Sequence, residues 1–235
     1  MKIVAVAGTK NTGKTTLVTL LVEELVRRGF QVGTVKHTHV KLDMEGKDTW
    51  KHREAGAQLV VGAGGDETFF LVDHSMELEQ IITSVECLKT LDFLVLEGYK
   101  PAYYAKISTS PLKDPFTLAQ VDMQELDREL IEELSNLVEE RSFGQLAKMD
   151  CGECGYEGCQ EMALAMVKGE IKEDICVMKK SSDVLLTING KPVPLNPFVK
   201  KFVKNTFMGM ISALKIEDPL EAQKIELLIQ NEGNR

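Results

Sequence analysis

The stretch that decides the fold is Gly8-Thr9-Lys10-Asn11-Thr12-Gly13-Lys14-Thr15, which matches the phosphate-loop pattern GxxxxGKT. A short apolar run over residues 2–7 precedes it and predicts a buried strand. A helical pattern over residues 15–28 follows it. Strand, loop and helix in this order are the context that the motif requires. The sequence therefore predicts a nucleotide-binding site near the start of the chain.

The spacing of this loop has a physical reason. Glycines at both ends let the backbone curl so that its N–H groups point at phosphate oxygens, and the following helix presents its positive end. Lys14 adds a positive charge for the β and γ phosphates, and the Thr15 hydroxyl can join Mg²⁺. The predicted nucleotide-binding residues are Gly8, Thr9, Lys10, Asn11, Thr12, Gly13, Lys14, Thr15 and Thr16.

Short apolar runs alternate with helical patterns over the first 140 residues, which indicates an α/β domain. Further strands are predicted at residues 31–36, 58–63, 68–72 and 92–96, and helices at 49–55, 76–91 and 124–141. The most hydrophobic strand, 92–96, runs into Glu97, and the carboxyl ends of parallel strands face the ligand. Glu97 and Lys14 are therefore the predicted catalytic residues, with Glu97 holding a metal-bound or attacking water. A carboxylate that only caps the next turn is the alternative.

A second group of polar residues follows the predicted strand 31–36. It comprises Lys36, His37, His39, Asp43, Lys47, Asp48 and Arg53. At the carboxyl end of a strand these residues can reach the phosphates, and Asp43 or Asp48 can share the magnesium ion. His37 and His39 fall on one side of an extended segment and suit a divalent metal, but a solvated loop explains them equally well.

Four of the five cysteines lie within residues 151–176, with the spacing Cx2Cx4Cx16C. Such a cluster is typical of metal ligation in a reducing compartment and not of a secreted disulfide framework. Cys151, Cys154, Cys159 and Cys176 suit either zinc or an iron–sulfur centre. Because only one CxxC knuckle is present, a [4Fe–4S] cluster is favoured over zinc. The fifth cysteine, Cys87, is predicted to be a small buried apolar residue.

The composition changes near residue 142, and three domains are predicted: 1–142, 143–180 and 181–235. The last region combines a hairpin, with strands 183–188 and 191–195 around Asn189-Gly190, and a helix over 197–214. An apolar stripe on that helix, including Phe198, Phe202 and Met210, is predicted to be core. The predicted fold is a P-loop three-layer α/β sandwich with a mainly parallel sheet, plus a small C-terminal iron–sulfur domain with a hairpin and a helix.

Composition and charge exclude several classes of protein. The 235 residues carry 28 basic and 36 acidic side chains, a net charge of −8, which argues against a nucleic-acid-binding protein. No apolar stretch reaches the roughly 18 residues that span a bilayer. The first residues are too short an apolar run for a signal peptide, so a cytoplasmic location without membrane attachment is predicted.

Several further motifs follow the phosphate loop in a fixed order. They are Val35-Lys36-His37-Thr38-His39, Glu45-Gly46-Lys47-Asp48-Thr49, His52-Arg53-Glu54-Ala55-Gly56-Ala57 and Leu96-Glu97-Gly98-Tyr99-Lys100. Together with the loop they resemble the molybdopterin-guanine dinucleotide biosynthesis protein B family over about residues 1–140. One departure is Val40, which stands where members often carry a further histidine.

This resemblance implies a GTP-binding, weakly hydrolytic protein, usually dimeric, that assists the nucleotidyltransferase attaching GMP to molybdopterin. It also implies that Lys14 and Thr15 hold phosphate and Mg²⁺, with Asp43, Asp48 and Glu97 around the metal. The expected partners are a molybdopterin guanylyltransferase, or another cofactor-maturation protein, and a second copy of the chain. The choice of GTP over ATP rests on the resemblance, because the chain has no NKxD-type guanine-recognition sequence.

The cysteine segment from Asp150 to Cys159, followed by Cys176, resembles the four-cysteine domain of corrinoid iron–sulfur protein large subunits. The B subunit of ion-translocating ferredoxin-oxidising complexes is similar. This resemblance covers about 30 residues and implies a [4Fe–4S] centre with all four cysteines as ligands.

The predicted function is an accessory GTPase of molybdenum or tungsten cofactor synthesis that carries a [4Fe–4S] cluster. An alternative is an electron-transfer protein whose nucleotide cycle gates reduction of a partner. A small-molecule kinase is disfavoured, because phosphoryl transfer usually recruits several arginines and Arg53 alone lies near the motifs.

Overall fold

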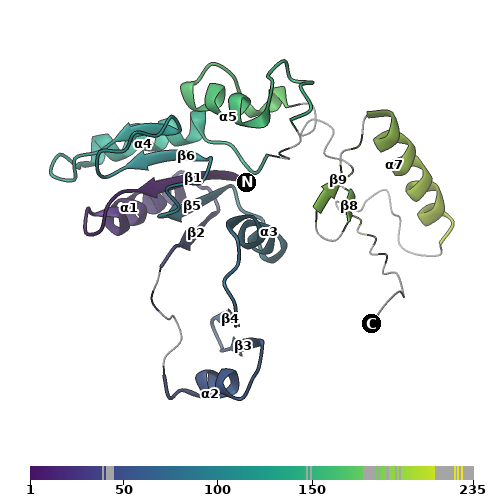
Figure 1. The fold of residues 1–235 in the computed structure, drawn as a ribbon, viewed down its shortest axis with the longest axis horizontal. Coiled ribbons are helices and arrows are strands. Elements are labelled where there is room, and N and C mark those ends of the chain that lie inside the picture. The colour runs from purple at the N-terminus through teal and green to yellow at the C-terminus, as the bar shows by residue number, and fades with distance from the viewer. Residues whose placement is uncertain are drawn as a thin grey trace. The chain divides into compact units, whose positions relative to one another are not determined.

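The protein is described by a computed structural model that places residues 1–38, 40, 45–146, 148, 150–176, 184, 186–188, 191–193, 195, 197–214, 225, 227 and 229. Two compact units divide the chain (Figure 1). Unit 1 comprises Met1–Leu146 and Cys159–Glu173, and unit 2 comprises Ala147–Gly158 and Asp174–Arg235.

A five-stranded parallel sheet forms the centre of unit 1. Its strands are β1 (Lys2–Ala7), β2 (Val32–Lys36), β5 (Phe93–Glu97), β6 (Ala105–Ser108) and β7 (Thr117–Gln120). They lie in the order β2-β5-β1-β6-β7, and every neighbouring pair is parallel. This order places β1, which leads into the phosphate loop, in the middle of the sheet beside β5, so the carboxyl ends of both strands share one edge.

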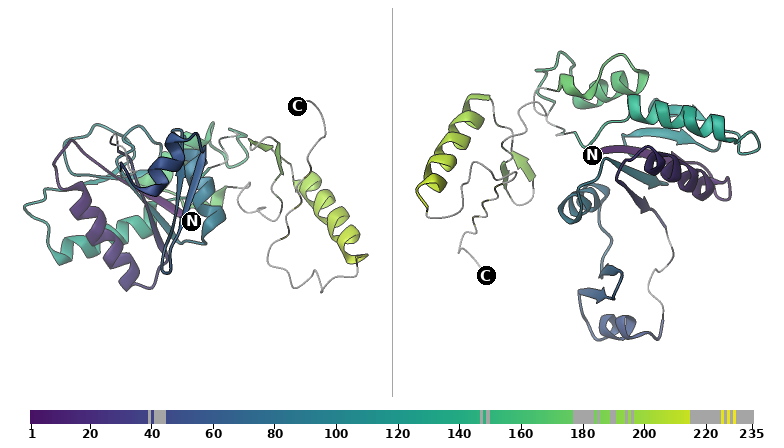
Figure 2. Two further views of the ribbon diagram at one scale, coloured as in Figure 1. Left: turned by 90° about the horizontal axis from the view of Figure 1, so that it is seen from below. Right: turned by 180° about the vertical axis from the view of Figure 1, so that it is seen from behind.

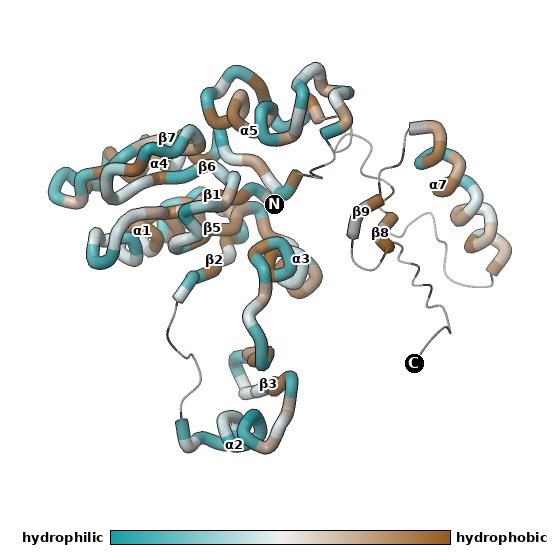
Figure 3. Tube along the Cα trace, in the orientation of Figure 1, coloured by the Kyte–Doolittle hydropathy of each residue, from teal (hydrophilic) through white to brown (hydrophobic). Residues whose placement is uncertain are grey.

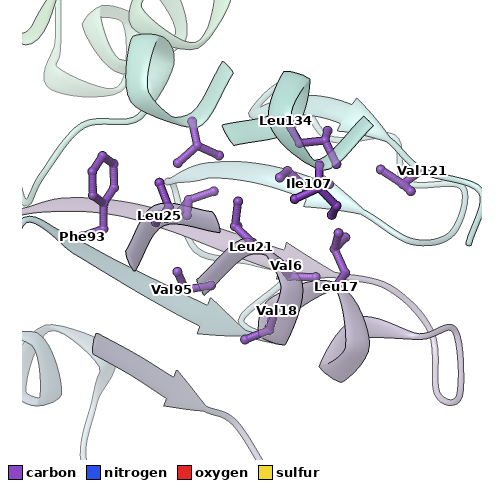
Figure 4. Packing of buried hydrophobic residues seen from close by; sticks show 13 residues of the cluster. Val6, Leu17, Val18, Leu21, Leu25, Phe93, Val95, Ile107, Val121 and Leu134 are labelled. Atoms are coloured by element: carbon purple, nitrogen blue, oxygen red, sulfur yellow. The ribbon is translucent and has the colours of Figure 1, made fainter. Parts of the chain in front are cut away.

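Helices cover both faces of this sheet, which confirms the predicted three-layer α/β sandwich. On one face lie α1 (Lys14–Arg27) and α4 (Arg128–Arg141), and on the other lies α3 (Leu78–Leu88) (Figures 1 and 2). The core between the sheet and the first two helices is built from hydrophobic residues of the strands and of both helices, nearly all of them aliphatic (Figure 4). Leu17, Leu21 and Leu25 recur at helical spacing along α1 and are fully buried, as the sequence pattern predicts.

The observed elements differ from the predicted ones in two informative places. Strands β6 and β7 were not predicted, because each has only four residues and β6 contains the charged Lys106. The predicted helix 124–141 begins at Arg128, because Asp127 caps it by accepting a hydrogen bond from the Leu130 N–H at 2.8 Å. The prediction that Cys87 is buried is wrong, since α3 leaves its side chain exposed.

A separate arm of unit 1 carries α2 (Asp48–Glu54), β3 (Leu59–Ala63) and β4 (Thr68–Val72). The two strands form an antiparallel hairpin of their own, and α2 packs against β3. Figure 3 shows hydrophobic colour along this hairpin. The arm therefore presents apolar residues outside the central core.

The last helix of unit 1 belongs to the region where an iron–sulfur domain is predicted. This helix, α5 (Cys159–Lys168), packs against α4 and β7 and buries Met162 and Met166. Phe143 is also fully buried and bridges to Ile3, beyond the predicted boundary at 142. The domain boundaries drawn from the sequence stay predictions. In the structure α5 belongs to the same unit as the sheet, because the apolar face of α5 is buried against α4 and β7.

Unit 2 holds the hairpin β8 (Leu186–Ile188) and β9 (Lys191–Val193) and the helix α7 (Pro197–Ser212). The predicted turn Asn189-Gly190 and the start of the first predicted strand lie outside the described residues. The prediction that the α7 stripe is core is wrong: Phe198, Phe202 and Met210 are largely exposed. Periodicity identifies an apolar helix face but not whether another element covers it. No helix in the described part of the chain has the length and apolarity to cross a bilayer.

Candidate functional site

The phosphate loop connects β1 to α1 in the predicted manner. Gly13 caps α1 with the left-handed backbone angles φ 79° and ψ 11°. A Cβ at this position would lie 2.8 Å from the Met123 side chain, so both the backbone angle and the space require glycine. The first turn of α1 then carries Lys14, Thr15 and Thr16 at the edge of the sheet.

Hydrogen bonds within the loop hold it in a compact form. The Thr9 carbonyl accepts from the Lys14 ammonium, and it also accepts from the Thr12 hydroxyl at 3.0 Å. Lys14 is therefore folded back onto the loop, and its ammonium contacts the backbone of the loop itself. Loop residues that were predicted from one short motif are thus brought together.

Thr109 and Ser110, which lie directly after β6, support the phosphate loop, although the sequence patterns did not single them out. Ser110 accepts a hydrogen bond from the Thr9 N–H at 3.1 Å, and the hydroxyls of Thr109 and Thr12 lie 2.6 Å apart. A Cβ on Gly8 would lie 2.2 Å from the Thr109 hydroxyl oxygen, so this close approach requires glycine. In the sequence, Thr109 and Ser110 are marked only by a short polar segment, and the strand before this segment, β6, was not predicted.

A buried ion pair anchors this supporting segment. The ammonium of Lys106, which is 1% exposed, lies 2.8 Å from the Asp114 carboxylate and 5.2 Å from the centre of the Phe116 ring. It also donates to the Ala102 carbonyl at 2.5 Å. Because a buried charge requires such partners, Lys106 ties the segment before β6, at Ala102, to the loop between β6 and β7, at Asp114.

Glu97, Lys36 and Thr15 form one polar cluster beside the loop. The Thr15 hydroxyl donates to Glu97 Oε1 at 2.8 Å, and the Lys36 ammonium lies 2.9 Å from the same oxygen. Lys36 also lies 3.3 Å from the Thr15 hydroxyl. Strand order explains the meeting, because Glu97 pairs in register with Lys36 of β2 on one side and with Val6 of β1 on the other. The carboxylate is 12% exposed and faces the first turn of α1.

The two acids at the ends of β5 have different surroundings. Asp92, at the start of the strand, accepts a hydrogen bond from the Gln31 N–H at 2.8 Å and so caps the turn before β2. Glu97, at the carboxyl end, is the acid that lies beside Thr15. The geometry agrees with the preference for Glu97 over Asp92 that strand direction predicts.

Among the residues that the structure describes, the other predicted metal ligands are not joined to this cluster. Asp43 and His39 lie outside the described residues. Asp48 starts α2, is 88% exposed and lies 3.2 Å from Lys51. The His37 ring packs against Tyr99 with centroids 5.0 Å apart, and burial raises the pKa of the Tyr99 hydroxyl. Within the described ranges, no three His, Cys, Asp or Glu side chains are gathered as a metal site.

None of the four cysteines of the predicted cluster is in a disulfide, and their surroundings differ. Cys151 is exposed, Cys154 and Cys159 are partly buried and Cys176 is buried. Cys154 lies within a tight turn that begins directly after Cys151, in which the Gly155 N–H donates to the Gly152 carbonyl at 2.9 Å. Cys159 is the first residue of α5. Four cysteines at this spacing fit the ligand chemistry of an iron–sulfur cluster or of zinc.

Two family models match the sequence. Residues 3–125 match the model described as "Molybdopterin guanine dinucleotide synthesis protein B", and residues 146–178 match the model described as "Putative Fe-S cluster". The second match contains all four cysteines of the Cx2Cx4Cx16C segment.

Similar proteins occur in archaea and bacteria. A protein of Methanocaldococcus jannaschii named "Putative molybdopterin-guanine dinucleotide biosynthesis adapter protein" is 32% identical over 240 residues, covering 97% of each chain. The molybdopterin-guanine dinucleotide biosynthesis adapter protein of Escherichia coli is 34% identical over 110 residues, 45% of this chain and 63% of that protein. A crystal structure of a MobB protein homolog from Bacillus stearothermophilus is 25% identical, with a TM-score of 0.46, and matches 60% of this chain and 100% of that one.

Proposed function

The chain belongs to the molybdopterin guanine dinucleotide synthesis protein B family, and we propose that it is a GTP-binding adapter in the synthesis of that cofactor. The adapter role is supported by the match of the relative from Methanocaldococcus jannaschii over 97% of both chains. We propose a molybdopterin guanylyltransferase, or another cofactor-maturation protein, as the partner, in the cytoplasm.

The observation that carries nucleotide binding is the phosphate loop with its neighbouring carboxylate. The loop lies between β1 and α1, and the first turn of that helix presents its N–H groups and Lys14 at the same edge of the sheet. Glu97 lies 2.8 Å from the Thr15 hydroxyl, so a hydroxyl and a carboxylate are adjacent where a P-loop protein holds its metal. The preference for GTP over ATP comes from the family.

The donor set at this position fits magnesium. Thr15 and Glu97 supply the hard oxygen ligands that Mg²⁺ prefers, and this ion usually keeps several waters and binds through one or two protein groups plus substrate phosphates. When bound, Mg²⁺ would neutralise charge on the β and γ phosphates. Lys14 would leave the Thr9 carbonyl to reach the same phosphates, and Glu97 would orient the attacking water. Asp43 and Asp48 remain proposed further ligands.

Lys14→Ala tests this function. The variant is expected to bind GTP at least about tenfold more weakly, because a charge-assisted contact to phosphate is lost, and to show no Mg²⁺-dependent hydrolysis. Calorimetry and phosphate release on the full chain measure both effects. The control is Lys100→Ala, which removes the same charge from an exposed position. Wild-type affinity and hydrolysis in the Lys14 variant would contradict the proposal.

We further propose that Cys151, Cys154, Cys159 and Cys176 bind one [4Fe–4S] cluster. Support comes from the ligand spacing, from the absence of a disulfide at these four cysteines and from the family model that matches residues 146–178. Zinc is the alternative metal for such a donor set.

Metal analysis of protein purified without oxygen distinguishes the two metals. A brown protein with about four irons per chain is expected, and Cys154→Ala should lose most of the iron and the associated absorption. Cys87→Ala is the matched control, because Cys87 is a free cysteine outside the cluster segment. A colourless wild-type protein with one zinc would overturn the iron–sulfur assignment.

A homodimer that forms through the β3–β4 hairpin is the proposed assembly. Leu59 pairs with Val72, and Val61 pairs with Phe70, so these four side chains share one face of the hairpin. They are between 37% and 56% exposed. A two-stranded hairpin is marginal in water and an uncovered apolar face favours association, so a second copy of the same face is a suitable cover.

A further inference from the structure

Lys36 has no role in the proposed function, although it lies beside the proposed metal ligands. Lys36 is the last residue of β2 and stands beside Glu97, the last residue of β5, in the parallel ladder. Its ammonium lies 2.9 Å from Glu97 Oε1 and 3.3 Å from the Thr15 hydroxyl. A positive charge therefore already contacts both groups that would hold Mg²⁺.

An ammonium ion and a magnesium ion cannot both occupy this position. Mg²⁺ bonds to oxygen at 2.0–2.1 Å, so an ion held by Thr15 and Glu97 would lie within a few ångströms of the present Lys36 nitrogen. Two cations at such a separation repel strongly beside a carboxylate that is 12% exposed. Entry of the metal must move the ammonium away from Glu97 Oε1.

The local structure allows the side chain of Lys36 to move while the backbone stays. The His37 N–H donates to the Glu97 carbonyl at 2.9 Å, which continues the ladder past the end of β2. The Lys36 side chain itself is 57% exposed, with a flexible stem of four methylene groups. A half-exposed ion pair of this kind contributes little to folding stability, so stability alone is a weak reason for a lysine here.

We propose that Lys36 holds the place of Mg²⁺ in the nucleotide-free protein and competes with the metal for Glu97 and Thr15. This inference rests on the proposed function, because it assumes that a nucleotide with Mg²⁺ binds at the phosphate loop. Without metal, the ammonium neutralises Glu97, so the carboxylate does not repel incoming phosphates. With metal, Mg²⁺ takes over this neutralisation and Lys36 is displaced. Lys36 thereby reduces the dependence of nucleotide binding on Mg²⁺.

Thermodynamic linkage makes this competition measurable as a ratio of two dissociation constants for the nucleotide. Mg²⁺ and nucleotide strengthen the binding of each other by one common factor, which equals the Kd for nucleotide without Mg²⁺ divided by the Kd at saturating Mg²⁺. Removing the competing ammonium weakens binding without metal and spares or strengthens binding with it. Lys36→Met, which keeps the length of the side chain but not its charge, is expected to raise the ratio about three- to five-fold, the range that a half-exposed ion pair supports.

The experiment measures the Kd of fluorescently labelled GDP for the full chain, with chelator and with saturating Mg²⁺. Lys36→Arg restores a cation and should return the ratio towards that of the wild type. Lys100→Met is the control for general loss of charge and should leave the ratio unchanged. A ratio in Lys36→Met equal to or below that of the wild type would overturn the inference. If the wild type binds neither labelled GDP nor labelled GTP with Mg²⁺, the proposed function itself fails, which is a distinguishable result.

Discussion

At the scale of single residues, the role of each acid depends on the group that its carboxylate contacts. Glu97 and Asp92 are acids at opposite ends of one strand, yet only Glu97 lies beside Thr15, whereas Asp92 caps a turn. Strand direction explains this difference, because only the carboxyl end of β5 reaches the phosphate loop. The two acids therefore form a matched pair for substitution.

Glu97→Gln is expected to lower the rate of Mg²⁺-dependent GTP hydrolysis by about a hundredfold or more, because the variant loses the carboxylate that we propose to orient the attacking water. Its amide keeps a carbonyl oxygen that can still accept from Thr15, so the loop should stay folded. Asp92→Asn is the control and should hydrolyse GTP at the wild-type rate. Steady-state phosphate release measures both, and equal rates in the two variants would contradict the assignment.

At the scale of elements, charged side chains join α1 to α4. Glu24, buried on α1, accepts hydrogen bonds from Arg27 at 2.7 and 2.8 Å and from Arg28 at 2.7 Å. Arg28 also reaches Asn136 of α4 at 2.7 Å and contacts Glu139. The bonds from Arg27 and then Arg28 lower the pKa of Glu24 from its ordinary 4.5 to about 2. Arg28, which Glu24 holds in place, thus links the two helices that cover one face of the sheet.

This coupling predicts a pH dependence of stability. Because the pKa of Glu24 is lower in the folded protein, its stabilisation is present above about pH 4.5 and is lost as the pH falls towards 2. Glu24→Gln should therefore lower the Tm at pH 7, and its difference from the wild type should shrink between pH 4.5 and 2. Glu23→Gln, an exposed neighbour on α1, is the control for charge. Thermal unfolding followed by circular dichroism gives both curves, and a constant difference across this range would refute the role of Glu24.

At the scale of the whole molecule, helix α5 comes from the cysteine segment of the sequence but belongs to the compact unit that contains the phosphate loop. Helix α5, which begins at Cys159, packs against α4 and β7. Three residues after the end of β7, the side chain of Met123 lies against Gly13 of the phosphate loop. The helix with one cysteine of the predicted cluster is therefore part of the same compact unit as the nucleotide site.

The oligomeric state is the prediction at this scale. Wild-type protein is expected to have twice the 26.2 kDa mass of the chain in solution. Val61→Lys should shift it to a monomer at micromolar concentration, because a charge would be buried in the centre of an apolar interface. Light scattering after size-exclusion chromatography measures the mass. Ser75→Lys adds the same charge at an exposed site beyond the hairpin and should leave the dimer intact. A dimeric Val61 variant would place the interface elsewhere.

Local patterns in the sequence were enough for the phosphate loop, the amphipathic α1 and the acid at the end of β5, because each depends on residues close together in the chain. Long-range packing decided the rest. The order β2-β5-β1 brings Lys36, Glu97 and Thr15 together, and the short strand β6 places Thr109 and Ser110 against the loop. The burial of α5 and the exposure of the α7 stripe likewise depend on which surfaces meet, and periodicity within one helix does not encode that.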